Sequence, residues 1–250
     1  SNFRNNTEYC NGGSSQQFGG GVAYNLGNMS YKSSNFTDNT GLTGGVNFNY
    51  GYMLIVDCNF DRNKAIVNKT LKRGGEGGVN FNHGFSTMII KSSNFTNNQA
   101  RSGGVNHNTG NMTIITSNFH GNSVTREGGV NYNDISLSSN GTLNITDSNF
   151  TNNNATTSGG VNFIMRNSTA IITNSNFTNN TAIKYGGVLY IQNATVDVIN
   201  STFTSNAQNA GVIYDFLDKK CNIINSTFKN NTAEKYGSAI YNYDNNLIIN

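Results

Sequence analysis

Residues 93–107 read SNFTNNQARSGGVNH, and this stretch holds the two motifs that decide the fold. In the first motif, Phe95 is followed three positions later by Asn98. In the second, a Gly-Gly-Val at 103–105 is followed, two positions after the Val, by the ring of His107. Both motifs recur nine times along the 250 residues, and the second is weakened in its last two copies. Such self-similarity marks a repeat architecture, in which each unit completes its core against its neighbours.

Each unit contains two short stretches of alternating apolar residues and no helical pattern. One begins at the Gly-Gly-Val, and the other is a step such as Met112 to Ile114, shortly before a Ser-x-Phe. Period-two alternation predicts β-strands, and the usual spacing of 24–27 residues fits one coil of a solenoid. The sequence therefore predicts an all-β, right-handed parallel β-helix of about nine coils, a pectin-lyase-like solenoid whose equivalent residues stack about 4.8 Å apart. We expect residues 1–250 to be one segment cut from a longer repeat array, with loop insertions near 7–19 and 61–76.

Asparagine dominates the composition, at 49 of 250 residues, while only 12% are charged and Pro and Trp are absent. A net charge of +3 with regularly spaced apolar residues excludes a disordered, highly charged tail, and Asn and Gly are poor helix formers. Identical amides stacked along a solenoid can bond to one another, because each amide both donates and accepts. We therefore expect the Asn of each Phe-x-x-Asn motif to belong to a structural ladder. Its predicted members are Asn6, Asn39, Asn63, Asn98, Asn122, Asn153, Asn180, Asn206 and Asn231.

The paired motifs resemble a known family. Phe-x-x-Asn together with Gly-Gly-Ala-(Ile/Leu/Val) is the double signature of the chlamydial polymorphic outer-membrane proteins and of adhesin-like β-helix arrays, and here Val mostly occupies the Ala position. The chain departs from the signature where Asn fills the aliphatic position, at residues 47, 80, 106, 131 and 162. The resemblance spans the whole chain. It implies a β-helix, and by analogy it implies surface display or adhesion.

The two faces of the first strand can be assigned in two ways. A column that carries a ring in all nine units is typical of a core, so we expect the Val and the ring to point inward. The intervening residues then form an outward interaction face for protein or glycan partners. Its predicted members are Asn47, Asn49, Asn80, Asn82, Asn106, Asn108, Asn131, Asn133, Leu189, Ile191, Ile213 and Ile240. The opposite arrangement buries the Asn and exposes a ladder of rings suited to stacking on sugars; low exposure of Asn80 with high exposure of Phe81 would favour it.

The compartment is predicted from sequons and cysteines. The chain contains 17 Asn-x-Ser/Thr triplets, and those that precede an inward Phe should face solvent as candidate N-glycosylation acceptors. These acceptors are Asn35, Asn94, Asn149 and Asn176. Cys58 and Cys221 occupy repeat columns and are expected to be small buried fillers, whereas Cys10 lies in a loop with no assignable partner. We expect a secreted or cell-surface protein, and no apolar run is long enough to span a membrane.

Catalytic and metal sites find little support. Glycoside hydrolysis needs two nearby carboxylates. The chain has only 13 acidic residues, and the two that share a column, Asp57 and Asp147, lie three coils apart. His83 and His107 fall in adjacent coils without a carboxylate or thiolate near them in sequence, so we expect no metal and no cofactor. Weak net charge also argues against nucleic acid as a partner.

These observations favour a non-catalytic extracellular platform, either an adhesin or a scaffold, on which proteins or glycans dock. Neighbouring coils of a longer chain are the expected partners at both ends. The alternative is a polysaccharide lyase or hydrolase of the parallel β-helix class.

Overall fold

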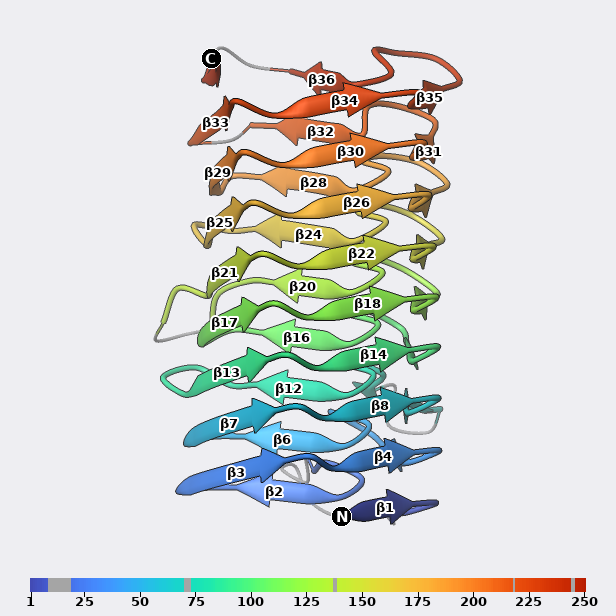
Figure 1. Cartoon of the computed structure of the whole chain (residues 1–250), viewed down its shortest axis with the longest axis vertical. Coiled ribbons are helices and arrows are strands. Elements are labelled where there is room, and N and C mark those ends of the chain that lie inside the picture. Colours follow the sequence, from blue (N-terminus) through green and yellow to red (C-terminus); the bar gives the residue numbers. More distant parts are fainter. Residues whose placement is uncertain (9–18, 70–72, 137–138, 218, 244–245) are drawn as a thin grey trace.

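The computed structural model describes residues 1–8, 19–69, 73–136, 139–217, 219–243 and 246–250. Within these ranges the chain is an all-β parallel solenoid of about eight turns without a helix. The coils stack along the long axis of the molecule from the N-terminus to the C-terminus (Figure 1). The predicted parallel β-helix is confirmed. Nine units give about eight turns because nine stacked strands are separated by eight steps.

The first strand of each coil belongs to a nine-stranded parallel sheet, called here the ladder sheet. Its strands begin directly after the Gly-Gly-Val motif, and the register sets equivalent residues side by side, as in Asn80 beside Asn106. In spatial order the strands are β2 (Ala23–Asn25), β6 (Asn47–Asn49), β12 (Asn80–Asn82), β16 (Asn106–Asn108), β20 (Asn131–Asn133), β24 (Asn162–Met165), β28 (Leu189–Gln192), β32 (Ile213–Phe216) and β36 (Ile240–Asn242).

The second strand of each coil forms the long-strand sheet, also nine-stranded and parallel. Its alternating burial, as in Met112 and Ile114 inward and Thr113 half-buried, follows the apolar period seen in the sequence. The strands are β3 (Asn28–Lys32), β7 (Tyr52–Val56), β13 (Thr87–Lys91), β17 (Asn111–Ile115), β21 (Thr142–Thr146), β25 (Thr169–Thr173), β29 (Thr195–Ile199), β33 (Lys220–Ile224) and β37 (Leu247–Ile249).

The third strand of each coil forms the Phe sheet, which carries the Phe of Phe-x-x-Asn on its inner face. Its strands are β1 (Asn2–Arg4), β4 (Asn35–Thr37), β8 (Asn59–Asp61), β14 (Asn94–Thr96), β18 (Asn118–His120), β22 (Asn149–Thr151), β26 (Asn176–Thr178), β30 (Thr202–Thr204) and β34 (Thr227–Lys229).

Two-residue strands complete each coil in an eight-stranded parallel short sheet. They are β5 (Thr40–Gly41), β9 (Lys64–Ala65), β15 (Gln99–Ala100), β19 (Ser123–Val124), β23 (Asn154–Ala155), β27 (Thr181–Ala182), β31 (Ala207–Gln208) and β35 (Thr232–Ala233).

The two predicted insertions are described to different extents. Within 61–76, β10 (Val67–Asn68) and β11 (Arg73–Gly74) form an antiparallel pair, and residues 70–72 lie outside the described ranges. Most of the insertion near 7–19 lies outside them too, as does Cys10. In the described part of the chain, no helix is long and apolar enough to cross a membrane.

Left-handed corners let each coil turn. In the coil that runs through β16 and β17, they fall at Gly103 (φ 64°) and at Thr116 (φ 49°), and the previous coil turns at Asn97 (φ 55°), just before its ladder Asn. A Cβ at Gly103 would lie 2.3 Å from the carbonyl oxygen of Asn106, so only glycine fits there. Elsewhere the corner residue is usually Asn, Asp or Ser, and Asn and Asp tolerate positive φ better than most residues.

The interior is a set of stacked columns. The Phe rings of the Phe sheet stack with centroids 4.6–4.9 Å apart and nearly parallel planes. A Ser stands two residues before all of these Phe except Phe60, which has Cys58 there. This Ser uses its hydroxyl twice: Ser117 Oγ donates to its own coil at the Ile115 carbonyl and accepts from the backbone N–H of Ser93 in the previous coil. Cys58 and Cys221 are fully buried in their columns.

The predicted Asn ladder is present at the next corner. Asn122 is fully buried; its Nδ2 donates to Asn153 Oδ1 and to the Phe95 carbonyl, both at 3.0 Å. Its Oδ1 accepts from both the side chain and the backbone N–H of Asn98. The same pattern links the ladder from Asn6 to Asn231.

The predicted orientation of the ladder sheet is wrong. The eight Asn of the expected outward face are at most 1% exposed, as are Leu189, Ile191 and Ile213, while Ile240 is half-buried near the chain end. These residues are Asn47, Asn49, Asn80, Asn82, Asn106, Asn108, Asn131 and Asn133. They form two further internal amide ladders, with Nδ2 to Oδ1 distances of 2.7–2.8 Å.

A shared carbonyl explains the error. The backbone N–H groups of Val105 and Asn106 both donate to the carbonyl of Val130, and the same pairing recurs in the coils from Val22 to Val188, whereas Val212 and Ile213 donate to two different carbonyls, those of Ser238 and Ala239. Two consecutive residues then occupy the space of one, as in a β-bulge. Val105 and Asn106 therefore both point inward, and the alternation continues from Asn106, so that the following ring points outward.

Candidate functional site

The rings of the ladder sheet form an aromatic ladder on the outer side of that sheet, where most rings are half-buried, Phe48 and Phe163 are buried and Tyr24 is exposed. Each strand contributes one ring, and neighbouring centroids lie 4.6–5.4 Å apart with interplanar angles of 3–17°. The members are Tyr24, Phe48, Phe81, His107, Tyr132, Phe163, Tyr190, Tyr214 and Tyr241. Because the rings stack on one another, their faces are covered within the ladder and mainly their edges are turned outward.

Three further rings pack at an angle against the ladder and are called here the second tier: Tyr50, His83 and Tyr185. Tyr50 and His83 lie 4.2 Å apart, at an interplanar angle of 36°. Tyr50 is 42% exposed and tilts 42° from Phe48. Tyr185 packs in the same way, 4.6 Å from Tyr214. Ring faces that could stack on a ligand therefore belong to this second tier rather than to the ladder.

Two adjoining hollows follow the ladder along the solenoid axis and together form what we call the trough. One has a volume of about 310 Å³ and is lined by Thr43, Phe48, Glu76, Phe81, His83 and His107. The other has a volume of about 380 Å³, shares Glu76 and His107 with the first, and extends to Tyr132, Phe163 and Met165. The trough thus spans several coils, with ring edges as its floor.

Charged residues flank the trough at both ends of the ladder strands. Glu76, Arg101, Arg126 and Glu127 come before the Gly-Gly-Val motifs, while Asp134 and Arg166 follow the strands. They form three ion pairs, namely Arg101 with Glu76 at 2.7 Å, Arg126 with Glu127 at 3.3 Å, and Arg166 with Asp134 at 3.5 Å. Three guanidinium groups and three carboxylates therefore balance around the trough.

Burial sets the protonation of the trough residues. Burial lowers the pKa of His107 to about 3, helped by the positive charges of Arg101 and His83, so His107 is neutral at physiological pH. Burial raises the pKa of the Glu76 carboxyl, although the nearby Arg101 opposes the shift. The pKa of Asp134 is raised by burial as well.

Three buried polar atoms on trough residues have no hydrogen-bond partner within the protein. They are Thr43 Oγ1, Arg101 Nε and His107 Nδ1. Unpartnered buried polar atoms are uncommon, since each costs the full desolvation penalty of the group. The trough is therefore the candidate functional site of the chain.

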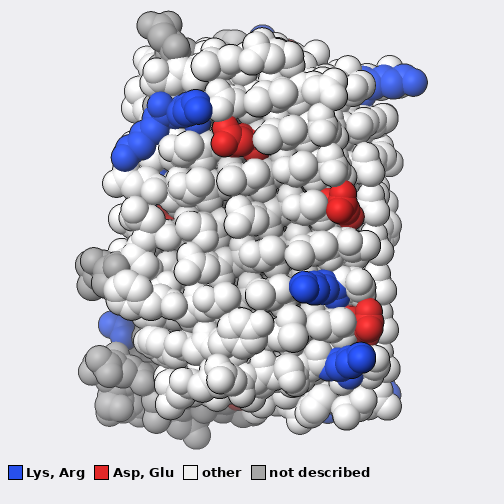
Figure 2. Space-filling model, turned by 60° about the vertical axis from the view of Figure 1, so that its left-hand side comes forward, with Lys and Arg blue, Asp and Glu red and all other residues white. Residues whose placement is uncertain are grey.

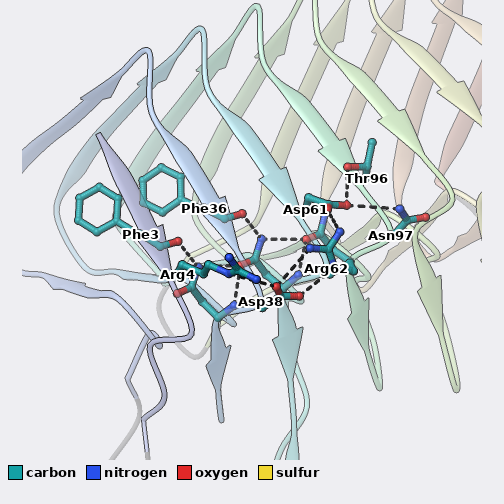
Figure 3. A network of polar contacts seen from close by, with 11 residues as sticks. Phe3, Arg4, Phe36, Asp38, Asp61, Arg62, Thr96 and Asn97 are labelled. Atoms are coloured by element: carbon teal, nitrogen blue, oxygen red, sulfur yellow. Dashed lines mark hydrogen bonds and ion pairs between the residues drawn. The ribbon is translucent and has the colours of Figure 1, made fainter.

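A separate charged network braces the outer side of the first coils (Figure 3). Arg62 pairs with Asp61 and, at 2.9 Å, with Asp38, while Arg4 lies 3.9 Å from Asp38. The hydrogen bond from Arg62 lowers the pKa of Asp38. Thr96 adds a 2.9 Å hydrogen bond to Asp61. This network links successive coils by contacts on the surface and lines none of the hollows of the trough.

The face drawn in Figure 2 carries little charge. Figure 2, in which the left-hand side of Figure 1 comes forward, shows a few small groups of Lys, Arg, Asp and Glu separated by wide uncharged areas. On the Phe sheet, the acceptors Asn35, Asn94, Asn149 and Asn176 are exposed as expected. With Asn2, Asn59 and Asn118 they form an outer amide ladder at 2.9–3.0 Å.

The structure does not assemble the other candidate groups. Asp57 and Asp147 lie three strand pairings apart. The third histidine of the chain, His120, lies on another sheet, the Phe sheet, and bonds to Thr151 at 2.9 Å. Among the described residues, no group of three His, Cys, Asp or Glu side chains could hold a metal ion.

The rim of the trough is what sequence reasoning missed. The sequence signal is weak but present: the residue directly before Gly-Gly forms a column, in which Glu76 pairs with Thr43 and Ser102 across coils. The column carries polar residues beside the trough. Further toward the C-terminus it continues through Ser158 to Tyr185 and Ala210.

Comparison with known proteins identifies the repeat. The Chlamydia polymorphic membrane protein repeat matches residues 174–192 and 225–243. Each match runs from the corner before Ser-x-Phe through the Gly-Gly-Val segment of one coil, so the chain contains repeats of this type. The family is one of outer-membrane or cell-surface proteins and is not an enzyme family. No curated protein and no solved structure matches the chain.

Proposed function

We propose that the chain is a non-catalytic, surface-displayed adhesion or docking platform that holds its partners in the trough. Repeats of the polymorphic membrane protein type and a solenoid fold fit a surface repeat protein. The observation that carries the proposal is the trough itself, where hollows, ring edges and unpartnered polar atoms coincide on one face.

A rigid solenoid suits this role. Each coil is bonded to its neighbours through backbone pairs and buried amide ladders, so the trough is held in shape before a partner arrives. Preorganisation reduces the entropy lost on binding. We propose a secreted or cell-surface location and, where the source glycosylates proteins, glycans on the exposed acceptors of the Phe sheet. That sheet is a different face, so glycans there leave the trough open.

Capture of partners from extracellular material tests the proposal. The bait is the chain immobilised on beads, compared with the double variant Arg126→Ala/Arg166→Ala, which removes two rim charges. The matched control is Arg4→Ala/Arg62→Ala, which removes the same charge from the network of Figure 3. The side chains are similarly exposed, 56% and 60% for the trough pair against 72% and 54% for the control.

We expect the trough variant to lose the partner and the control to keep it. Equal capture by both variants would place the docking surface elsewhere, and no capture by the unaltered chain would indicate a spacer. Cleavage of a polysaccharide by the unaltered chain, abolished by Glu76→Gln, would overturn the non-catalytic assignment in favour of a glycoside hydrolase or lyase.

A further inference from the structure

Tyrosines gather on the last three strands of the ladder sheet, toward the C-terminal end of the molecule (Figure 1). From Phe48 to Phe163 the aromatic ladder contains one tyrosine, Tyr132, whereas β28, β32 and β36 each carry one. Two more tyrosines stand directly before the glycine motif of their coils. The five residues, called here the tyrosine cluster, are Tyr185, Tyr190, Tyr214, Tyr236 and Tyr241.

The hydroxyl groups of the tyrosine cluster lie close to one another. Burial raises the pKa of Tyr214 to about 12, and the neighbouring hydroxyl groups of Tyr241, Tyr185, Tyr190 and Tyr236 add to the shift. The pKa of Tyr190 is raised as well, first by burial and then by Tyr185. Tyr190 and Tyr214 are therefore neutral phenols at physiological pH, within a group of five phenols on one part of the surface.

The tyrosine cluster contains stacked pairs and tilted pairs. The ladder rings are stacked: Tyr190 and Tyr214 lie 5.4 Å apart at an interplanar angle of 5°, and Tyr214 and Tyr241 lie 4.7 Å apart at 17°. Tyr185 is tilted by 37° against Tyr214 at 4.6 Å, and Tyr236 is tilted by 49° against Tyr241 at 5.0 Å. Tilting turns the edge of one ring toward the other ring, whereas parallel stacked rings meet with their faces.

The pair of Tyr185 and Tyr214 connects two coils. In the column before Gly-Gly, Tyr185 pairs with Ala210 of the next coil. The small side chain of Ala210 leaves room for the Tyr185 ring to lean across to Tyr214. Tyr185 is 38% exposed, so a reagent in solution can reach it. The other tilted pair of the cluster, Tyr236 and Tyr241, belongs to a single coil.

A one-electron oxidant can join two phenols held in this way. Each phenol loses an electron and its hydroxyl proton and becomes a phenoxyl radical, whose unpaired electron is shared with the ring carbons ortho to the oxygen. The two radicals combine by forming a carbon–carbon bond between ortho carbons, and the hydrogens on those carbons then move to the oxygens and restore both phenols. The two electrons and two protons removed in total reduce one hydrogen peroxide to two water molecules.

The geometry of the product favours the tilted pair. In a dityrosine the two rings are directly bonded through ortho carbons and are twisted relative to each other. Tyr185 and Tyr214 are already tilted and need small ring movements to reach this arrangement. A stacked pair such as Tyr190 and Tyr214 would have to leave its stack, because a bond between two faces is not possible for these carbons.

We propose that Tyr185 and Tyr214 are an oxidative cross-linking site, where a peroxidase with hydrogen peroxide joins a Cε atom of one ring to a Cε atom of the other. The bond ties neighbouring coils together on the outer side of the ladder sheet. Like a disulfide, it restricts the unfolded chain and so stabilises the solenoid. Neither tyrosine lines the trough, so the site is independent of the proposed docking function.

Oxidation of the whole chain at low protein concentration tests the proposal. The chain is treated with a plant peroxidase and hydrogen peroxide, the monomer is isolated by size-exclusion chromatography, and dityrosine is measured by its fluorescence. Mass spectrometry of proteolytic peptides then locates the cross-link. We expect dityrosine in the monomer, a cross-linked peptide pair that contains Tyr185 and Tyr214, and a higher melting temperature than that of the untreated chain.

Tyrosine-to-phenylalanine variants assign the cross-link. Tyr185→Phe and Tyr214→Phe each remove a hydroxyl group and keep the ring, so both should fold. Each should abolish this peptide pair and the rise in melting temperature on oxidation, which is measured against the same variant before treatment. The matched control is Tyr52→Phe on the long-strand sheet, because Tyr52 is 39% exposed and Tyr185 is 38% exposed. This control should keep both the cross-link and the rise.

Three results would overturn the proposal. The first is a monomer without dityrosine, and the second is dityrosine confined to cross-linked oligomers. The third is a monomer in which other tyrosines alone are joined, such as the wider tilted pair of Tyr24 and Tyr50, whose centroids lie 6.1 Å apart. Cross-linking of Tyr185 to Tyr214 in a chain that captures no partner would uphold this site and remove the docking function alone.

Discussion

Removing one internal ladder amide should destabilise the solenoid far more than removing an identical amide from its surface. In Asn122→Ala, the side chain loses four hydrogen bonds, two donated by Nδ2 and two accepted by Oδ1. The backbone N–H of Asn98 then has no partner at a fully buried position. At about 1 kcal/mol for each bond, with the desolvation of the orphaned N–H included in the upper range, the expected loss is about 3–5 kcal/mol.

The matched control lies four residues earlier in the same coil. Asn118→Ala makes the same substitution in the exposed amide ladder of the Phe sheet, where Asn118 bonds to Asn94 and Asn149 at 3.0 Å. Water can replace both bonds there, so the expected loss is below about 1 kcal/mol. Both variants remove the same atoms, and the two sites differ in burial and in the number of side-chain hydrogen bonds, four at Asn122 and two at Asn118.

Guanidinium unfolding followed by circular dichroism measures both losses, and hydrogen exchange at the Asn98 amide reports the local effect. We expect Asn122→Ala to shift the midpoint strongly and to remove protection of the Asn98 N–H, with Asn118→Ala close to the unaltered chain. Equal destabilisation by the two substitutions would refute the assignment of stability to buried amides.

Three further predictions concern the core, the corners and the trough. Phe119→Ala should cost about 3–5 kcal/mol in chemical denaturation because it opens a cavity in a stacked column, whereas Phe85→Ala, at a residue 77% exposed, should stay within about 0.5 kcal/mol. Gly103→Ala should lower the melting temperature, since positive φ costs a residue with a Cβ about 1–2 kcal/mol and the added carbon meets a carbonyl oxygen at 2.3 Å, while Gly27→Ala, with no atom within 4 Å, should not. The folded pKa of His107, about 3, lies below its unfolded value, so its contribution to stability is present above about pH 6.5 and is lost as pH falls toward 3. Between pH 7 and pH 5, the unaltered chain should lose about 2 kcal/mol more unfolding free energy than the His107→Phe variant. Identical pH profiles of the two proteins would show that His107 titrates normally.

The fold could be predicted because its determinants repeat. Nine Phe-x-x-Asn motifs fix the columns, and the equivalence of Asn98 and Asn122 in sequence becomes a hydrogen bond in the structure. The orientation of the ladder sheet could not be predicted, because it depends on whether Val105 and Asn106 share one carbonyl of the next coil. That is a property of backbone pairing between units, and period-two alternation within one unit does not contain it. The trough was missed for a similar reason: Glu76 and Arg101 meet only when two coils are stacked.

In each coil, the residues that repeat to maintain the fold and the residues that line the trough occupy different positions. Inward columns must stay uniform, because an amide ladder works only if the next coil also supplies an amide, as Asn106 does for Asn80. The rim of the trough carries no such constraint, since the side chains of Arg101, Arg126 and Arg166 reach solvent and each makes one ion pair. Rim residues can therefore change from coil to coil without loss of fold. A solenoid of this kind can acquire a new ligand by substitution at the rim alone, and exchanging the residues before Gly-Gly between coils should move the trough along the axis while leaving stability nearly unchanged.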